Sequence, residues 1–285
     1  MTDEENLIPR KLWLLWYQGV AEAPFIVKKC IDSWVNKNPT WEVIVLDSSN
    51  LNDYIKLDVP EDVLENIPLT QQSDLVRMLL LSKYGGVWAD ATTFCTKPLD
   101  EWIEGCSESG FFVFHKPGRD RVMSIWFVAS QKDSPICDKL CNNLRSYWIE
   151  NNFNKPNGFQ RKLISKLSKK FNRSDRTTKH WFNPVVTKIL KVYPYFVFHY
   201  MFERLVFEDD ECKAIWMKTK KVSADLPHLI LHTGLFSSLS PSVKKQVDDN
   251  DMPLFKLSWK CDFSRYSKDT SLYYLIEGRE DLGAE

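Results

Sequence analysis

The sequence lacks the features that mark exported, disulfide-stapled or membrane-spanning proteins. Its seven cysteines are odd in number, scattered, and form no CxxC pair, so we expect buried thiols in a reducing compartment. The first residues, MTDEENLIPRK, are acidic and have no apolar core, which excludes a signal peptide. No run approaches the ~20 apolar residues of a membrane-spanning helix. The expected location is therefore the cytoplasm.

The sequence also lacks an excess of charge of either sign. Lys and Arg together number 38, and so do Asp and Glu, so no overall field draws the protein to nucleic acid or anionic lipid. The segment GCSESG at 105–110 is not followed by the Gly-Lys-Ser of a phosphate-binding loop. No GxGxxG follows the first predicted strand, and no GxSxG nucleophile elbow occurs. These absences leave other classes of enzyme and binding protein open.

The chain does contain enough apolar residues to form a large core. Of its 285 residues, 44% are apolar and 27% are charged, the ordinary composition of a soluble globular domain. Eleven tryptophans are many for this length. They indicate either a large aromatic core or a site that stacks on sugar rings or bases, and composition alone favours the core.

The first part of the chain alternates between patterns typical of strands and of helices. Residues 11–16 and 41–47 read as buried strands, and residues 23–39 carry apolar side chains at helical spacing up to Pro39. A strand, a helix and a second strand in so short a stretch form a βαβ unit, which begins a parallel sheet.

Later segments continue this pattern. We expect a helix at 70–86 with Thr70 or Ser73 as its N-cap, and a helix at 134–151 with Ser134 as its N-cap and Pro135 in its first turn. Further strands are predicted at 87–90, 110–116, 122–130 and 228–234, and residues 183–207 are predicted to be mostly helical. The chain is therefore predicted to be an α/β protein with a mostly parallel central sheet flanked by helices.

Residues 152–183 differ from the rest because they are rich in Lys and Arg, with only Asp175 opposing. Part of this stretch, FQRKLISKLSKKF, predicts a short amphipathic basic helix. It is either a solvated surface excursion or a patch that binds an anionic membrane or acceptor, with apolar insertion by Leu163, Ile164, Leu167 and Phe171. No repeat or low-complexity linker is present, so residues 1–285 are predicted to form one domain that carries this basic, partly helical insertion.

One carboxylate stands at the end of an apolar strand in the segment KYGGVWADATTF, residues 83–94. This residue is Asp90, and ligands of open α/β sheets bind outside the carboxyl ends of the strands. A carboxylate there is costly unless it is paired or bound to a cation. Asp90 therefore either holds a divalent ion together with a substrate diphosphate or simply caps the following turn.

Two further features favour a site at this edge of the sheet. Asp74 and Arg77 are three residues apart on the preceding predicted helix, so they project from one face. They form either a plain ion pair or a second part of the site. His232 ends the predicted strand HLILHTG and is either structural or a ligand that completes a metal site.

Together, IPRKLWLLWYQG, WEVIVLD and SDLVRMLLLSKYGGVWADATTF resemble the capsular polysaccharide synthesis family. That family is grouped with the glycosyltransferases of family 32 and is similar to the glucosylating domains of large clostridial toxins. The resemblance is dense over residues 8–104 and returns at YPYFVFHYMFERL and HLILHTG. It implies a GT-A-type fold that binds a nucleotide sugar and a divalent metal, Mn²⁺ or Mg²⁺. The Asp-x-Asp motif of such enzymes maps onto Asp90-Ala91-Thr92, where Thr92 replaces the second acid.

The resemblance also implies roles for individual residues. Asp90 would hold the metal together with His232 and the donor's diphosphate. Asp74 and Arg77 would grip the ribose or the donor sugar and would share the catalytic role with Asp90. The remaining donor-binding positions would be Trp16, which stacks on the nucleobase, Gln18, Tyr84, Gly86, Thr92, and Lys260, which neutralises the leaving diphosphate.

The implied activity is transfer of a hexose from a nucleoside-diphosphate sugar, with a UDP-sugar as the first expectation. The acceptor would be a surface polysaccharide or a glycolipid, and the configuration at the anomeric carbon would be retained. A lipid-linked acceptor would place the protein at the inner face of the membrane. Because the second acid of the motif is missing, the alternative is a catalytically silent scaffold that binds sugar nucleotides in a polysaccharide assembly complex.

Overall fold

The computed structural model describes residues 8–249 and 252–278. The strands are β1 (Lys11–Leu15), β2 (Glu42–Leu46), β3 (Gly86–Ala89), β4 (Thr93–Cys95), β5 (Phe111–Gly118), β6 (Arg121–Ser130), β7 (Val222–Ser223) and β8 (Leu254–Lys256). The helices are α1 (Phe25–Lys37), α2 (Leu51–Tyr54), α3 (Glu61–Leu64), α4 (Leu69–Tyr84), α5 (Pro135–Asn151), α6 (Gly158–Phe171), α7 (Val197–Glu208), α8 (Asp210–Lys218), α9 (Leu229–Thr233), α10 (Pro241–Asp249) and α11 (Ser271–Tyr273).

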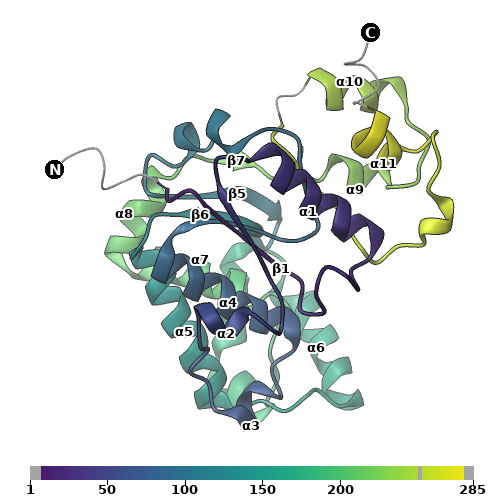
Figure 1. The fold of residues 1–285 in the computed structure, drawn as a ribbon. Coiled ribbons are helices and arrows are strands. Elements are labelled where there is room, and N and C mark those ends of the chain that lie inside the picture. Colours follow the sequence, from purple (N-terminus) through teal and green to yellow (C-terminus); the bar gives the residue numbers. More distant parts are fainter. Residues whose placement is uncertain (1–7, 250–251, 279–285) are drawn as a thin grey trace.

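The central sheet has six strands in the order β2-β1-β3-β6-β5-β7, and β4 and β8 form a separate pair. The pairs β1–β2, β1–β3 and β5–β7 are parallel, whereas β6 runs antiparallel to both of its neighbours. Parallel pairs are therefore in the majority, and helices flank the sheet (Figure 1). This confirms the predicted α/β class, with a mostly parallel central sheet flanked by helices.

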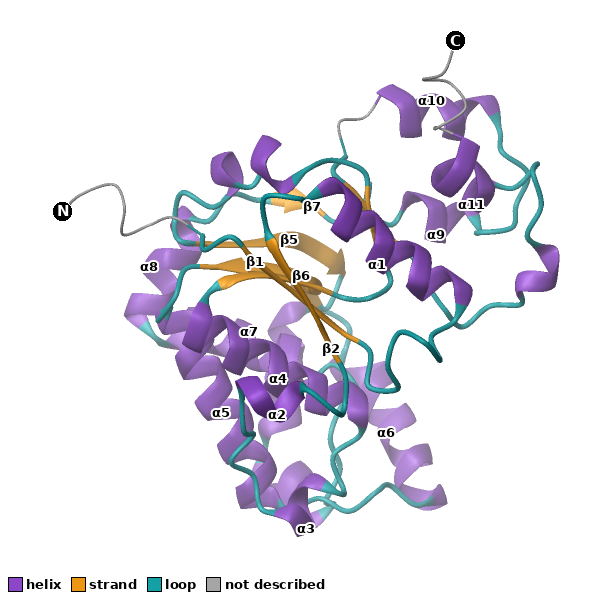
Figure 2. Ribbon diagram, viewed as in Figure 1, coloured by secondary structure: helices purple, strands orange, loops and turns teal. Residues whose placement is uncertain are grey.

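The apolar run of β1 is unbroken because the strand is covered on both faces. Leu12 and Leu14 pack into a cluster with α1, α9 and α11, whereas Trp13 and Leu15 pack into a cluster with α4, α5 and α7. Successive side chains of a strand point to opposite faces, so a strand between two helical layers needs apolar residues throughout. Figures 1 and 2 show these layers above and below the sheet.

The helix before Asp90 begins at Leu69, ahead of both of its predicted caps. Pro68 precedes α4, and Thr70 and Ser73 lie inside the first two turns. The Ser73 hydroxyl donates to the Thr70 carbonyl at 2.7 Å instead of capping a free N–H. The prediction of an N-cap at Thr70 or Ser73 is therefore wrong, because Pro68 occupies the N-cap position and the helix begins at Leu69. The predicted start of α5 at Pro135 is confirmed.

The two glycines after α4 join the helix to β3 through positive φ angles. Gly85 has φ +66° and ends the helix, and Gly86 has φ +96° and begins β3. A Cβ on Gly86 would lie 2.4 Å from the carbonyl oxygen of Lys11. Only glycine allows β3 to approach β1 this closely, which brings Asp90 to the sheet edge.

The segment predicted as a strand at residues 228–234 is a helix, so that prediction is wrong. It forms α9, in which the rings of His228 and His232 stack with their centroids 5.4 Å apart. Only Ile230 of this helix is buried. A short apolar run fits a strand and a buried helical turn equally well by periodicity. The C-terminal strand is instead β8, which pairs with β4.

The basic insertion contains the predicted amphipathic helix, α6, which Asn157 caps through a hydrogen bond from the Gln160 N–H. The apolar side chains of α6 beyond its first turn are Leu163, Ile164, Leu167 and Phe171. They pack against a small buried cluster made by Trp181, Val186, Val192 and Tyr200. These four side chains are therefore partly buried within the protein, and their insertion into a membrane stays a prediction. Among the residues described, no helix has both the length and the apolar content to cross a membrane.

Candidate functional site

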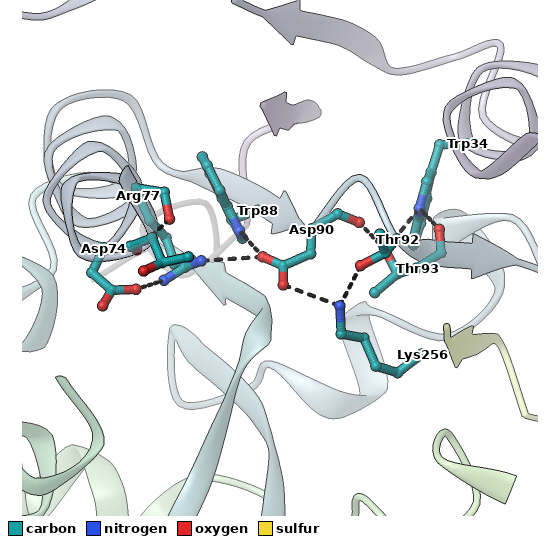
Figure 3. A network of polar contacts seen from close by, with 10 residues as sticks. Trp34, Asp74, Arg77, Trp88, Asp90, Thr92, Thr93 and Lys256 are labelled. Carbon is teal, nitrogen blue, oxygen red and sulfur yellow. Dashed lines mark hydrogen bonds and ion pairs between the residues drawn. The ribbon is translucent and has the colours of Figure 1, made fainter. Parts of the chain in front are cut away.

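The structure brings Asp74, Arg77 and Asp90 together at the carboxyl edge of the sheet (Figure 3). Asp90 directly follows β3, and Arg77 lies on α4. Arg77 Nη1 donates to Asp74 Oδ1 at 2.7 Å, and Nη2 donates to Asp90 Oδ1 at 3.1 Å. One guanidinium thus joins both carboxylates. The reading of Asp74 and Arg77 as a plain intrahelical pair is wrong, since Arg77 also reaches Asp90 and its side chain is only 3% exposed.

A second cation reaches Asp90 from near the end of the chain. Lys256 Nζ lies 3.3 Å from Asp90 Oδ2 and also donates to the hydroxyl of Thr92. Lys256 ends β8, where it stands opposite Thr93 of β4. The sequence patterns did not predict this residue, and selected Lys260 instead. The signal that was available is a single lysine inside the apolar run PLFKL.

The backbone around Lys256 is held from two sides. Its N–H donates to the carbonyl of Pro227 at 2.8 Å, and the N–H of Leu257 donates to the carbonyl of Thr92 at 2.8 Å. The side chain of Lys256 is only 17% exposed. Tertiary contacts therefore hold Lys256 beside the Asp90-Ala91-Thr92 motif, whereas a lysine on the open surface would be flexible.

Asp90 itself is also held in place. Trp88 Nε1 donates to Asp90 Oδ1 at 3.0 Å, and the Asp90 N–H donates to the carbonyl of Trp126 at 2.8 Å. The Thr93 hydroxyl donates to the Asp90 carbonyl at 2.6 Å, and Trp34 Nε1 donates to the Thr93 carbonyl at 2.9 Å. The Asp90 side chain remains 29% exposed. It is therefore an ordered carboxylate that a ligand can reach.

The two carboxylates of the network have opposite pKa shifts. Burial raises the pKa of Asp74 to about 6, and the charge of Arg77 offsets this only in part. Burial also raises the pKa of Asp90, but the charges of Lys256 and Arg77 outweigh it and leave that pKa below its ordinary value. Asp90 is therefore ionised at neutral pH, whereas Asp74 exchanges its proton near pH 6.

Aromatic side chains enclose the guanidinium of Arg77. Its Cζ lies 4.7 Å from the centroid of the Trp88 ring and 5.7 Å from that of Phe198. Stacking of this kind holds the planar group in one orientation. Arg77 thus orders Asp74 and Asp90 relative to one another.

Two buried polar groups that the sequence patterns did not select lie near this network. Burial, followed by the charge of Asp74, raises the pKa of the Tyr17 phenol. Burial, followed by the charges of Arg121 and Arg77, holds the pKa of His199 well below its ordinary value, so this imidazole is neutral. Tyr17 Oη and His199 Nδ1 have no hydrogen-bond partner among the described residues. Tyr17 and His199 each lie in an apolar run of the sequence, and a single polar residue in such a run was the signal that could have indicated them.

Trp16, the predicted nucleobase position, belongs to an aromatic pair at the end of β1, and its role toward a base stays a prediction. Trp16 packs edge-to-face on Trp259 with ring centroids 5.6 Å apart, and Lys260 Nζ lies 5.5 Å from the Trp259 centroid. Trp16 and Lys260, far apart in sequence, therefore meet through Trp259. Gln18 is exposed in the turn that follows β1. Because β1 and β3 are parallel, this turn lies at the same sheet edge as Asp90.

Two predicted donor-binding residues lie at the other end of β3. Tyr84 and Gly86 precede the strand, and Asp90 follows it, so Gly86 and Asp90 are about 13 Å apart at ~3.3 Å per residue. The Tyr84 hydroxyl donates to the Tyr54 carbonyl at 3.0 Å. The structure therefore does not bring Tyr84 and Gly86 to the site, and both act in packing.

The residues around Asp90 do not fit a divalent metal. His232 is exposed on α9, where it stacks on His228. Within residues 8–249 and 252–278, no group of three or more His, Cys, Asp or Glu side chains could hold a metal ion. Both oxygens of Asp90 already accept N–H groups, and Lys256 bridges Asp90 and Thr92, where a metal held by the motif would bind. The metal, with His232 as its ligand, therefore stays a prediction that these contacts do not favour.

The chain matches one family model and is similar to several curated glycosyltransferases. The family model described as "Capsular polysaccharide synthesis protein" matches residues 1–181 and 168–275. The O-glycosyltransferase braB of Annulohypoxylon truncatum is 27% identical over 159 residues, which are 49% of this chain and 38% of that protein. The initiation-specific alpha-1,6-mannosyltransferase of Candida albicans is 32% identical over 110 residues, 35% of this chain and 28% of that protein. The chain thus spans well under half the length of these curated relatives.

Solved structures also cover most of the chain at low similarity. The UDP-bound glycosyltransferase domain of the YGT toxin aligns with a TM-score of 0.42 and 10% identity, covering 86% of this chain and 89% of that domain. A likeness this distant carries no inference about ligands.

Proposed function

The chain belongs to the capsular polysaccharide synthesis protein family, and on that premise we propose that it is a glycosyltransferase that uses a nucleoside-diphosphate sugar. The observation that carries the proposal is the ordered carboxylate of Asp90, held by Arg77 and Lys256 at the carboxyl edge of the sheet. This edge is where α/β folds bind nucleotides. The aromatic pair at the end of β1 supplies a surface for a base to stack on.

The proposed donor is a hexose nucleotide, with UDP as its nucleotide, and the proposed acceptor is a surface polysaccharide or a glycolipid. We also propose retention at the anomeric carbon. The name of the mannosyltransferase relative specifies an alpha linkage, which supports an α-linked product from an α-linked donor. No carboxylate of the network is free to act as a nucleophile: Arg77 and Lys256 engage Asp90, and Asp74 is buried. Same-face substitution through an oxocarbenium-like ion pair therefore fits the described residues best.

The residues of the site have distinct proposed tasks. Arg77 orders Asp90, and ionised Asp90 orients the cation that faces the donor's diphosphate. Trp16 and Trp259 position the base, and Lys260 adds positive charge beside them. Electrostatic groups that are fixed before the reaction stabilise charge as it develops on the leaving diphosphate.

A donor screen tests the proposal directly. Purified protein is incubated with UDP-, GDP- and dTDP-sugars, with saccharide acceptors and without them, and release of the nucleoside diphosphate is measured. Asp90→Asn serves as the inactive control. Release from one donor that depends on Asp90 supports the proposal, and the absence of release from every donor contradicts an enzymatic role.

The second candidate function is a silent scaffold that binds sugar nucleotides in an assembly complex. Thr92 in place of the second acid favours it, because the motif then carries one negative charge where related motifs carry two. A scaffold would bind a nucleoside diphosphate in calorimetry and show no turnover with any donor and acceptor. The same screen, run beside a binding titration, therefore separates the two functions.

We further propose a cytoplasmic location with peripheral contact to an anionic membrane. All seven cysteines are free thiols, which suits a reducing compartment. The basic side chains of α6 are exposed, including Lys162, Lys166, Lys169 and Lys170. Because the apolar side chains of α6 beyond its first turn are partly buried, the proposed anchors are Phe159 and Ile189, which are 74% and 73% exposed. Gln160, next to Phe159, donates a hydrogen bond to the carbonyl of Lys191 at 3.1 Å and so links the start of α6 to the segment that contains Ile189.

A further inference from the structure

We propose that the ammonium group of Lys256 replaces the divalent metal at this site, so that the protein binds the diphosphate of its donor without a metal ion. The inference rests on the proposed function, because it concerns how the same site holds a sugar nucleotide. It departs from the metal that the motif Asp90-Ala91-Thr92 leads one to expect.

The position of Lys256 is the first observation. Its Nζ bridges the first and third residues of the motif, contacting Asp90 Oδ2 at 3.3 Å and the hydroxyl of Thr92 (Figure 3). In an Asp-x-Asp site, a metal would lie between those same two side chains. Strand pairing with Thr93, together with the hydrogen bonds to Pro227 and from Leu257 to Thr92, fixes the lysine there.

The charge balance is the second observation. Asp90 is the one ionised carboxylate of the motif, and it already faces the two cations Arg77 and Lys256. Thr92 contributes no negative charge where a second acid would stand. A divalent ion at this point would have to displace Lys256 or lie beside its ammonium, where like charges repel. Mg²⁺ and Mn²⁺ also prefer several oxygen ligands, whereas Asp90 Oδ1 already accepts N–H groups from Arg77 and Trp88.

The chemistry of the ammonium fits the task. It has three N–H donors, and Asp90 and Thr92 take two of them. The third can donate to an oxygen of the donor's diphosphate, and Asp90 holds the ammonium in position. During transfer the anomeric C–O bond breaks and its electron pair stays on the diphosphate oxygen. The acceptor oxygen bonds to the same carbon, and its proton leaves with the diphosphate. Lys256 stabilises the added charge and exchanges no proton.

The test is a calorimetric titration of the full chain with UDP and, in parallel, GDP. Each titration is run in EDTA and again in manganese chloride. The variants are Lys256→Met, which keeps the aliphatic stem and removes the charge, and Lys256→Arg, which keeps a cation. Lys268→Met is the matched control, because Lys268 is an exposed lysine in the same C-terminal part of the chain. A double variant, Thr92→Asp with Lys256→Met, restores the second acid and removes the lysine.

We expect the wild-type protein to bind one of the two nucleotides with the same dissociation constant in EDTA and in manganese. Lys256→Met should weaken binding in EDTA by about tenfold or more, the loss expected for one hydrogen bond to a charged group. Lys256→Arg should retain binding in EDTA, and Lys268→Met should bind like the wild type. The double variant should bind only when manganese is present.

Wild-type binding that requires manganese, with Lys256→Met unaffected, overturns the inference and leaves the proposed function standing. If neither nucleotide binds in either buffer, the proposed function fails and this inference fails with it. Should Lys256→Met not fold, the wild-type comparison between EDTA and manganese, together with Lys256→Arg, still decides the question.

Discussion

Asp90 and Lys256 stand 166 residues apart in the sequence, yet Lys256 Nζ lies 3.3 Å from Asp90 Oδ2. On its other oxygen Asp90 accepts from Arg77 at 3.1 Å. Cations from both halves of the chain therefore hold the carboxylate that ends β3. A carboxylate so constrained is already positioned when a ligand arrives, which is the arrangement that electrostatic catalysis requires.

Asp90→Asn should leave the fold intact and lower turnover by ~10²–10³-fold, the loss typical of one preorganised electrostatic group. The swap is nearly isosteric, and the side chain is partly exposed. Donor turnover and the melting temperature are measured on the same preparation. Asp47→Asn is the matched control, because Asp47 follows β2 of the same sheet and accepts a hydrogen bond from the Ser49 N–H in its own turn. Wild-type turnover in Asp90→Asn would remove Asp90 from the mechanism.

Asp74 should make the protein less stable as the pH rises from about 4 to about 6. Its pKa is raised from 3.8 to about 6 in the folded state, so the folded state binds more protons than the unfolded state in this window, and the free energy of unfolding falls with rising pH. A shift of this size corresponds to at most ~3 kcal/mol.

Urea unfolding of the wild type and Asp74→Asn at several pH values checks this prediction. The variant has no titrating group at this position, so the difference in free energy of unfolding between the two proteins should change across the window and stay constant above it. Parallel curves for the two proteins would show that Asp74 is not the buried acid inferred here.

Arg77→Met should lower stability as well as activity, because it leaves the Asp74 carboxylate buried without its partner. The side chains of Arg77 and Asp74 are only 3% and 8% exposed, and breaking a buried pair commonly costs ~3–5 kcal/mol. The loss should be smaller at pH 5 than at pH 7, since Asp74 can then take up a proton. Unfolding curves at both pH values measure it. A loss that is the same at both, or below ~0.5 kcal/mol as for exposed helical pairs, contradicts the burial argument.

Trp16→Leu should weaken nucleotide binding by about tenfold, because stacking of one base on an aromatic ring contributes ~1–3 kcal/mol. The dissociation constant of the nucleoside diphosphate is measured by titration, with inorganic diphosphate as a ligand that has no base. Affinity for inorganic diphosphate should not change. If both ligands lose affinity equally, Trp16 acts on the fold of the site and not on the base.

The basic insertion should give salt-sensitive binding to vesicles that contain anionic lipid. Each basic residue near such a surface contributes ~1 kcal/mol. Co-sedimentation at low and high salt is compared for the wild type, for the triple variant Lys166→Glu, Lys169→Glu and Lys170→Glu, and for Phe159→Ser with Ile189→Ser. Both variants should sediment less than the wild type. Wild-type protein that stays in the supernatant at low salt would return this segment to a solvated surface role.

Much of the fold was predictable from the sequence because local patterns carry it. The apolar runs of β1 and β2, the helical spacing of α1, and the glycines after α4 each depend on near neighbours in the chain. The same holds for Asp90, which stands out as a carboxylate at the end of an apolar strand, and for the shared face of Asp74 and Arg77. The sequence by itself therefore determined the α/β class and one side of the site.

Only the tertiary structure decided the other side of the site, where Lys256 contacts Asp90. Lys256 meets Asp90 only because β8 pairs with β4, and no local pattern encodes a pairing between strands so far apart in the chain. In the same way, residues 228–234 became helix α9, and the apolar side chains of α6 beyond its first turn became partly buried, through contacts with other elements of the fold. Burial then set the charges, since the pKa of Asp74 rises and that of Asp90 falls according to what packs around each carboxylate. Periodicity specifies which residues are apolar, but the partner of a charged group depends on the assembled fold.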